Sequence, residues 1–370
     1  HLLTSLYNLY FLMGDIKEAK LILENGDEFK GFSFGAEHSR SGEVVFNTGM
    51  VGYPESLTDP SYKGQILVLT YPLIGNYGVP GNEKERNILK NFESDKIQVQ
   101  ALIISDYSFE YSHWNAKRSL SDWLKEENIP AIYGIDTRKL TKILREKGAM
   151  LGKIVFDNED IDFYDPNVID IVKDVTIKEP IIYNEKSNQK KIVVVDCGIK
   201  NNIIRNLIKR NLTVIRVPYN YDFLREFFDG LVISNGPGDP KICAQTIYNI
   251  GRAMKHNIPT FGICLGNQLL ALAAGGDTYK LKYGHRSQNQ PCTLVNTKRC
   301  FITTQNHGFA VDMKSLSDEW QEFFVNANDG TNEGIKHKTK PFMSVQFHPE
   351  GHSGPEDTNF LFDDFVKLLK

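Results

Sequence analysis

Cysteine is scarce in this sequence and never occurs in a paired pattern. Five cysteines are scattered along 370 residues, and no two of them form a Cys-x-x-Cys pair. An odd, scattered set argues against a disulfide framework, and the missing pair argues against a structural zinc site. We therefore predict a protein of a reducing compartment, the cytoplasm, with no metal bound to this chain.

The sequence also lacks an excess of basic residues and any long apolar run. Its 43 lysines and arginines face 46 aspartates and glutamates, so no electrostatic footprint for nucleic acid is present. No run approaches the ~20 apolar residues of a membrane span. The apolar residues 1–12 lack the basic segment and cleavage site of a secretory signal. They are read as an extension ahead of a start at Met13, with a remnant of a targeting sequence as the alternative.

The chain length of 370 residues predicts two domains. In the first domain, short alternating apolar runs are broken by turn signals such as Asn25-Gly26, a pattern typical of hairpins. Two helices are predicted there, over residues 119–128 and 137–147. The second has Asp136 at its cap and an apolar face on one side.

A polar stretch at residues 174–191 indicates a linker, so we place the domains at residues 15–180 and 190–370. The second domain opens with a continuous apolar run, 192–196, typical of a parallel strand buried on both faces. Helical and strand patterns then alternate, with helices at 201–210 and 244–256 and strands at 214–217, 231–234 and 260–263. The predicted fold class is α/β: a mixed β-rich α/β domain followed by a doubly wound domain.

Cys264 lies between two glycines, directly after a strand-like run and directly before a helix-forming stretch. The string Gly262-Ile-Cys264-Leu-Gly266 is the cysteine form of a nucleophile elbow. A helix N-terminus beneath the thiol lowers its pKa and offers N–H groups to an oxyanion. A buried cysteine is more often a small core residue, so this motif alone leaves both interpretations open.

A second apolar run ends in His348-Pro349-Glu350. A nucleophilic cysteine needs a base, usually histidine, and a rigidly held carboxylate can orient that imidazole. The alternative is a histidine that only ends a strand beside a solvated glutamate. Cysteine, histidine and glutamate at strand ends of one α/β domain favour the catalytic interpretation.

At these residues the chain resembles the class I, triad-type glutamine amidotransferases, and above all the glutaminase subunit or domain of carbamoyl phosphate synthetase. The resemblance runs from about residue 20 to residue 370. Its first-half strings discriminate best, because other amidotransferases lack that domain. The likeness is carried by Phe46-Asn-Thr-Gly-Met50, Gly52-Tyr53, Leu57-Thr-Asp-Pro-Ser-Tyr62, Leu69-Thr-Tyr-Pro-Leu-Ile-Gly-Asn-Tyr-Gly78, Val232-Ile-Ser-Asn-Gly-Pro-Gly-Asp-Pro240, Tyr283-Gly-His-Arg-Ser-Gln-Asn-Gln-Pro291 and Ile302-Thr-Thr-Gln-Asn-His-Gly-Phe-Ala-Val-Asp312.

The resemblance implies a Cys-His-Glu triad. Cys264 would attack the side-chain amide of glutamine and form a γ-glutamyl thioester, while His348 serves as base and then acid. Glu350 would orient the imidazole. The N–H of Leu265 and one from the loop Gly236-Pro-Gly238 would hold the oxyanion.

The same resemblance implies a set of substrate-binding residues. Gln268 would contact glutamine from the first turn of the elbow helix. Asn306, Gly308 and Phe309 would grip its α-amino and carboxylate ends, largely through backbone groups. Gly49 occupies a place where many relatives have a serine in the glutamine pocket, so only a backbone contact could be kept there.

Two positions qualify this assignment. His307 competes with His348 for the role of base, but it lacks a Pro-Glu partner and is read as structural. Asn267 departs from the usual Cys-Leu-Gly-His-Gln string, and relatives that depend on free ammonia share this asparagine but have lost the cysteine. Because Cys264 is present, we predict an active glutaminase.

The predicted function is hydrolysis of glutamine to glutamate and ammonia, with ammonia passed to a carbamoyl phosphate synthetase large subunit or fused synthetase domains. The glycine-rich strings lack the Lys-Ser/Thr of a P-loop, so no cofactor is expected in this chain. ATP and magnesium are expected on the synthetase partner, and neither nucleic acid nor a membrane is expected to bind. The alternatives are a non-catalytic regulatory module of the same synthetase and an amidotransferase of another synthase.

Overall fold

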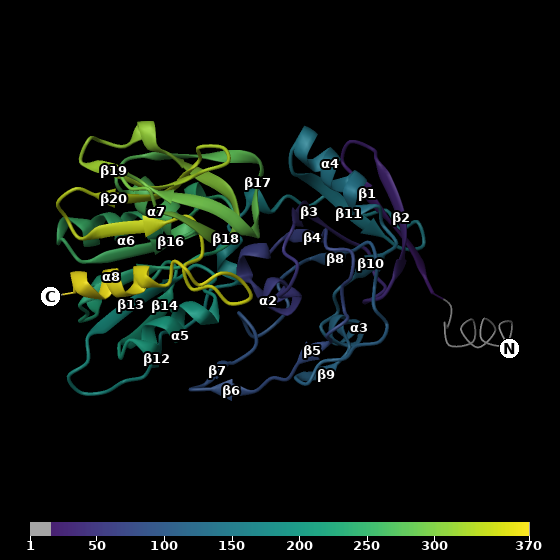
Figure 1. Ribbon diagram of the computed structural model, residues 1–370, viewed down its shortest axis with the longest axis horizontal. Helices are drawn as coiled ribbons and strands as arrows, with labels where there is room; N and C mark the ends of the chain where they lie inside the picture. Colours follow the sequence, from purple (N-terminus) through teal and green to yellow (C-terminus); the bar gives the residue numbers. More distant parts are fainter. Residues whose placement is uncertain (1–15, 370) are drawn as a thin grey trace, which may run out of the picture.

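A computed structural model describes residues 16–369 of the chain, and it divides them into two units side by side (Figure 1). The unit coloured from purple to blue-teal holds the first part of the chain, and the unit coloured from teal through green to yellow holds the last part. The predictions for residues 1–12 and Met13 lie outside the described residues. Within residues 16–369, no helix is both long enough and apolar enough to cross a bilayer.

Seven strands of the N-terminal unit close into a barrel. The pairing order is β1 (Glu18–Leu23), β11 (Met150–Val155), β3 (Arg40–Asn47), β4 (Gln65–Leu69), β8 (Ala101–Ile103), β10 (Ala131–Tyr133) and β2 (Glu28–Ser33). The Asn25-Gly26 turn joins β1 and β2 as an antiparallel hairpin. Because the barrel is closed, its strands leave no open sheet edge with a row of unpaired backbone N–H and C=O groups.

Helices and short strands surround the barrel, and α4 (Thr137–Lys147) has the predicted bounds. Its cap Asp136 accepts a hydrogen bond from Lys139 N at 2.8 Å, and Leu140 and Leu144 are buried in the barrel core. The other elements are α2 (Tyr53–Thr58), α3 (Leu120–Glu126), β5 (Val79–Pro80), β6 (Lys84–Glu85), β7 (Ile88–Leu89) and β9 (Ala116–Arg118).

The polar stretch 174–191 is more structured than its composition indicates. Strand β12 (Ile181–Tyr183) lies within it and pairs antiparallel with β14 (Thr213–Pro218). Because β12 is an edge strand with exposed isoleucines, it shows little of the apolar alternation that a sequence pattern needs.

The C-terminal unit is built on a ten-stranded sheet. Its order is β12, β14, β13 (Lys191–Asp196), β15 (Gly230–Ile233), β16 (Thr260–Ile263), β21 (Phe342–Val345), β20 (Asn332–His337), β19 (Trp320–Asn326), β17 (Asp277–Leu294) and β18 (Cys300–Asp312). The run from β14 to β21 is parallel, and the strands beyond β21 are antiparallel.

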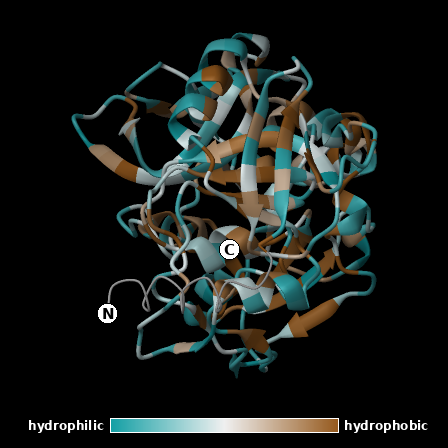
Figure 2. Ribbon diagram, turned by 90° about the vertical axis from the view of Figure 1, so that its right-hand side faces the viewer, coloured by the Kyte–Doolittle hydropathy of each residue, from teal (hydrophilic) through white to brown (hydrophobic). Residues whose placement is uncertain are grey.

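Helices cover both faces of the parallel strands, which confirms the predicted fold class. Helices α5 (Asn201–Lys209) and α8 (Phe360–Leu368) bury apolar side chains in one core. Helices α6 (Ala244–Lys255) and α7 (Leu265–Ala273) bury theirs in a second core on the other face. Figure 2 views the molecule from the side of the N-terminal unit, and there brown, hydrophobic residues lie along strands while teal residues are frequent in the outer loops.

Candidate active site

Cys264 stands at a sharp turn between β16 and α7, with φ 55° and ψ −104°. A non-glycine residue in this region costs of order 1–3 kcal/mol, a cost typical of functional sites. The glycines on either side make the turn sterically possible. A Cβ on Gly266 would lie 2.1 Å from Ile233 O, and one on Gly262 would lie 2.4 Å from Gly266 O.

His348 and Glu350 follow β21, the strand that lies parallel beside β16. Both side chains therefore emerge at the same sheet edge as Cys264, where ligands of doubly wound folds bind. The imidazole Nδ1 lies 2.7 Å from Glu350 Oε1, and both residues are buried. Within the described residues, Nε2 of His348 forms no hydrogen bond of normal length and angle.

The charges around His348 favour its protonated form. Burial lowers the pKa of the imidazole, but Glu350 outweighs it, and the sulfur of Cys264 adds to the rise while Lys200 opposes it. The net effect raises the pKa of His348 to about 10. Burial raises the pKa of Glu350, but Lys200 and His348 together lower it below its usual value. The arrangement is an imidazolium–carboxylate pair.

Lys200 forms a buried ion pair with the carboxylate of this pair. Its Nζ lies 2.9 Å from Glu350 Oε1, and both side chains are almost fully buried. Asn202, in the first turn of α5, donates from Nδ2 to Glu350 O at 2.6 Å. Burial lowers the pKa of Lys200, yet Glu350 and Glu93 raise it overall. The sequence offered no motif for Lys200, because its partners lie in distant segments.

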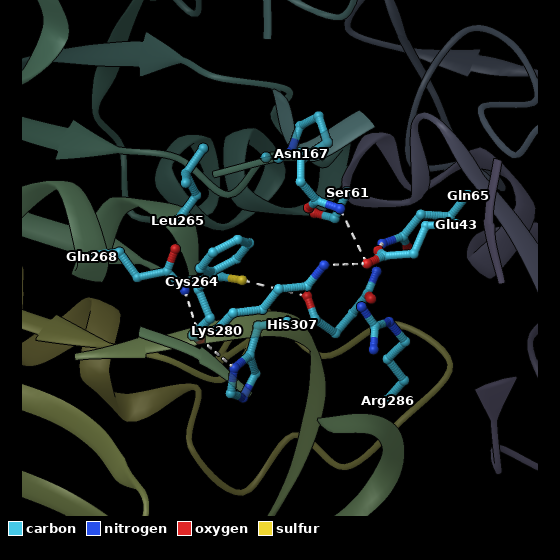
Figure 3. A pocket seen from close by; sticks show the side chains of 16 residues that line it. Glu43, Ser61, Gln65, Asn167, Cys264, Leu265, Gln268, Lys280, Arg286 and His307 are labelled. Carbon is cyan, nitrogen blue, oxygen red and sulfur yellow. Dashed lines mark hydrogen bonds and ion pairs between the residues drawn. The ribbon is translucent and has the colours of Figure 1, made fainter. Parts of the chain in front are cut away.

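A cavity opens beside Cys264, between the two units (Figure 3). The N-terminal unit contributes Glu43, whose Oε1 lies 2.7 Å from Lys280 Nζ at the cavity wall. Most of the predicted substrate-binding residues line this one cavity with the cysteine. They are Gly236, Gly238, Leu265, Gln268, Asn306, Gly308 and Phe309.

The contacts of Gln268 and Asn306 brace the cavity, and the backbone of Leu265 lies at the start of the elbow helix. Gln268 donates from Nε2 to Phe309 O at 2.9 Å, which connects the elbow helix to β18. The carbonyl of Asn306 accepts from Cys264 Sγ at 3.5 Å. The first N–H groups of α7, including that of Leu265, have no carbonyl partner within the helix and remain available to an anion.

Gly49 is not among the residues that line this cavity. It lines a small neighbouring pocket with Met50 and Val51, and its N–H donates to Asn47 Oδ1 at 2.6 Å. A role of Gly49 in glutamine binding stays a prediction.

Asn267 is buried at the elbow and is not among the residues that line the cavity. Its Nδ2 donates to Gln346 Oε1 at 3.1 Å, and its Oδ1 accepts from Ser344 Oγ at 2.8 Å. Gln346 in turn approaches Cys264 Sγ at 3.7 Å. The unusual asparagine is thus a brace between α7 and β21, with all its side-chain hydrogen bonds made to neutral groups.

His307 belongs to a buried polar cluster with His285 and Glu333, whose Oε1 lies 4.0 Å from His307 Nε2. His307 Nδ1 donates to Phe309 O at 2.8 Å, and burial holds its pKa well below the usual value. His285 lies between Asp329, at 2.8 Å, and Glu333, at 3.3 Å. These three residues are the group among residues 16–369 whose geometry approaches a metal site. Both ring nitrogens of His307 are already engaged, one by Phe309 O and the other by Gln305 Oε1. The cluster supports the backbone of the cavity wall.

Comparison with known proteins identifies the family. Residues 193–368 match the family model Glutamine amidotransferase class-I, and residues 21–154 match the model Carbamoyl-phosphate synthase small chain, CPSase domain. The carbamoyl phosphate synthase arginine-specific small chain of Neurospora crassa is 50% identical over 362 residues, which are 95% of this chain and 80% of that one. This chain belongs to the carbamoyl phosphate synthase small-chain family. The resemblance stated from the motifs is confirmed.

This small-chain homologue is also similar to segments of longer proteins. It is 56% identical to Multifunctional protein CAD of Squalus acanthias over 95% of the chain and 16% of that protein. It is 50% identical to the mitochondrial carbamoyl-phosphate synthase (ammonia) of Homo sapiens over 95% of the chain and 24% of that protein. The chain thus spans about a quarter or less of the length of these relatives.

Proposed function

We propose that this small-chain homologue hydrolyses glutamine to glutamate and ammonia through Cys264, His348 and Glu350. The proposal rests chiefly on one observation: the carboxyl ends of two neighbouring parallel strands deliver the cysteine and the His-Glu pair to one sheet edge. An imidazolium beside a thiolate is the charge state in which a cysteine acts as nucleophile.

The chemistry then proceeds in two balanced stages. The Cys264 sulfur attacks the side-chain amide carbon, and the oxyanion is held by backbone N–H groups at the start of α7 and in the Gly236-Pro-Gly238 loop. His348 gives its proton to the leaving nitrogen, and ammonia departs from a γ-glutamyl thioester. Water, losing a proton to His348, attacks the thioester and frees glutamate and the thiolate.

We further propose that the ammonia is used by a carbamoyl phosphate synthetase large subunit or fused synthetase domain, where ATP and magnesium would bind. The family membership supports such a partner, and the names of relatives include both free small chains and multifunctional proteins. A cytoplasmic location stays part of the proposal. The contacts of Asn267 do not favour a non-catalytic module, because this residue braces the elbow and leaves the cavity unobstructed.

The test measures how fast the chain releases glutamate from glutamine. It is done with the chain alone and then with the large, synthetase subunit of a carbamoyl phosphate synthase together with ATP and bicarbonate. We expect slow basal hydrolysis, acceleration by the synthetase, and loss of both in Cys264→Ser. Hydrolysis that never responds to the synthetase would contradict the partner and keep the chemistry. Absence of hydrolysis in both conditions would overturn the catalytic proposal and favour a regulatory module.

A further inference from the structure

Arg286 is a buried cation without an anionic partner in the wall of the proposed glutamine cavity. Its side chain is 6% exposed, and it lines the cavity together with Cys264 (Figure 3). Its Nη1 donates to Tyr283 O at 2.8 Å, whereas its Nε has no hydrogen-bond partner within residues 16–369. No carboxylate of those residues forms an ion pair with the guanidinium. A buried, incompletely satisfied charge is costly, so its retention points to a ligand.

The nearest acidic side chain in the cavity is already occupied. Glu43 accepts hydrogen bonds from Gln65 Nε2 at 2.8 Å and from Asn167 Nδ2 at 3.1 Å. It also forms the 2.7 Å ion pair with Lys280. Glu43 acts on Arg286 through space without a direct contact, and burial still holds the pKa of this arginine below its usual value. The guanidinium therefore remains available to an anion that enters the cavity.

Two glycines make room for this guanidinium at the cavity. A Cβ on Gly284, which has φ +71°, would lie 2.4 Å from Arg286 Nη1. A Cβ on Gly308 would lie 3.3 Å from Arg286 Nη2. Arg286 is also the direct cross-strand partner of Asn306, whose carbonyl contacts the Cys264 sulfur. The cation thus sits beside the segment expected to grip the substrate.

We infer that Arg286 binds the α-carboxylate of the amino-acid substrate and selects for substrates that carry one. This inference rests on the proposed glutaminase function and adds a specificity residue to it. A planar guanidinium pairs with a carboxylate through two parallel hydrogen bonds, and it supplies charge where backbone N–H groups supply only dipoles. Glutamine carries this carboxylate at the end opposite its reacting amide.

The test separates carboxylate recognition from turnover by using the full chain with the Cys264→Ser substitution. Calorimetry measures the dissociation constants of L-glutamine and of L-glutaminamide, in which a neutral amide replaces the α-carboxylate. We expect glutamine to bind at least about 30-fold more tightly, the range of a charge-assisted hydrogen bond. Equal affinities would overturn the inference without any substitution at Arg286.

Variants of Arg286 then assign that preference to one side chain. Arg286→Met should weaken glutamine binding by about 30- to 100-fold and glutaminamide binding by less than about threefold, while Arg286→Lys should retain part of the preference. Arg225→Met, at a 79% exposed side chain outside the cavity, is the matched control and should change neither. Equal losses for both ligands would mean that Arg286 only shapes the pocket, which overturns the inference.

These outcomes remain distinct from those of the proposed function. Carboxylate-dependent binding without hydrolysis by the unsubstituted chain would uphold the role of Arg286 and contradict the glutaminase. Hydrolysis of glutamine by a chain that binds glutamine and glutaminamide equally well would uphold the glutaminase and contradict the role of Arg286.

Discussion

The carboxylate of Glu93 lies 2.7 Å from Nδ1 of His352, and this contact joins the N-terminal unit to the loop that carries Glu350. Glu93 is fully buried, and its Oε2 accepts a hydrogen bond from Asn202 N at the start of α5, at 3.0 Å. Burial raises the pKa of Glu93, but Lys200 and His352 lower it to about 2. The charge balance behind the proposed triad therefore depends on both units.

The Glu93–His352 pair should make stability depend on pH. Burial lowers the pKa of His352, but Glu93 and Glu55 raise it overall, against Arg205. Because the pKa of His352 is higher in the folded state, its contribution to stability is fully present below the unfolded pKa of about 6.5. That contribution is lost as the pH rises through the folded pKa. Because the pKa of Glu93 is lower in the folded state, its contribution to stability is fully present above about pH 4.5 and is lost as the pH falls through about 2. The pair is therefore strongest between about pH 4.5 and 6.5.

His352→Gln should accordingly reduce the free energy of unfolding by about 1–2 kcal/mol at pH 6 and by clearly less at pH 9. Urea denaturation at both values measures this difference. In a Glu93→Gln background the pH dependence of the His352 effect should become clearly smaller, with only the weaker influence of Glu55 remaining. A difference that is constant from pH 6 to pH 9 would contradict the ion pair.

Glu350→Gln should shift the alkaline limb of the proposed glutaminase activity to lower pH. The carboxylate opposes burial and Lys200, which both lower the pKa of His348, so its removal lets the imidazolium deprotonate earlier. A displacement of at least about one pH unit is expected, since a neighbouring opposite charge shifts a pKa by about 1–3 units. The pH profile of kcat/KM measures it, with Glu350→Asp as the conservative control. An unmoved alkaline limb would exclude Glu350 as the partner that sets the charge of His348.

Lys200→Met should destabilise the fold by about 3–5 kcal/mol, because Glu350 and Glu93 would remain as buried carboxylates without their shared cation. Chemical denaturation gives the loss directly. Lys367→Met removes an exposed ion pair with Asp364, which water and salt screen, and should leave the stability essentially unchanged. Similar small losses for both variants would mean that water screens the Lys200 site.

Gly266→Ala should abolish the proposed glutaminase activity and destabilise the C-terminal unit by at least about 2 kcal/mol. Its Cβ would collide with Ile233 O, and relief would require α7 to move away from β15. Gly251→Ala is the control within α6, where the Cβ meets only Ala273 O at 3.8 Å. That substitution should raise stability by about 0.5–1 kcal/mol through helix propensity. An active, stable Gly266→Ala variant would refute the steric account of the elbow.

Elements governed by neighbouring residues were predictable from the sequence. The cap Asp136 and the apolar positions of α4 lie within one helix, and β16 with its glycine-flanked Cys264 lies within seven residues. The family motifs also contain most of the residues that line the cavity. Local patterns of this kind depend on short-range sterics and on the period of apolar residues.

Residues that act through distant partners were not predictable in the same way. The pairs Lys200–Glu350 and Glu93–His352 join segments more than 100 residues apart, so no spacing in the sequence reveals them. Arg286 stood in a quoted motif, but only its burial without an anion distinguishes it from a solvated arginine. Strand β12 forms through its antiparallel pairing with β14, a contact that its own residues do not indicate.

The order of residues along the chain was thus enough for the fold class, for most helices and strands and for the family to which the chain belongs. The catalytic roles of Cys264, His348 and Glu350 stay a prediction. Tertiary structure alone decided which charges face one another and which remain unpaired. The physical reason is that desolvation and Coulomb energies depend on distances in space. Those distances are set only when folding brings segments that are far apart in the sequence together, against the loss of chain entropy.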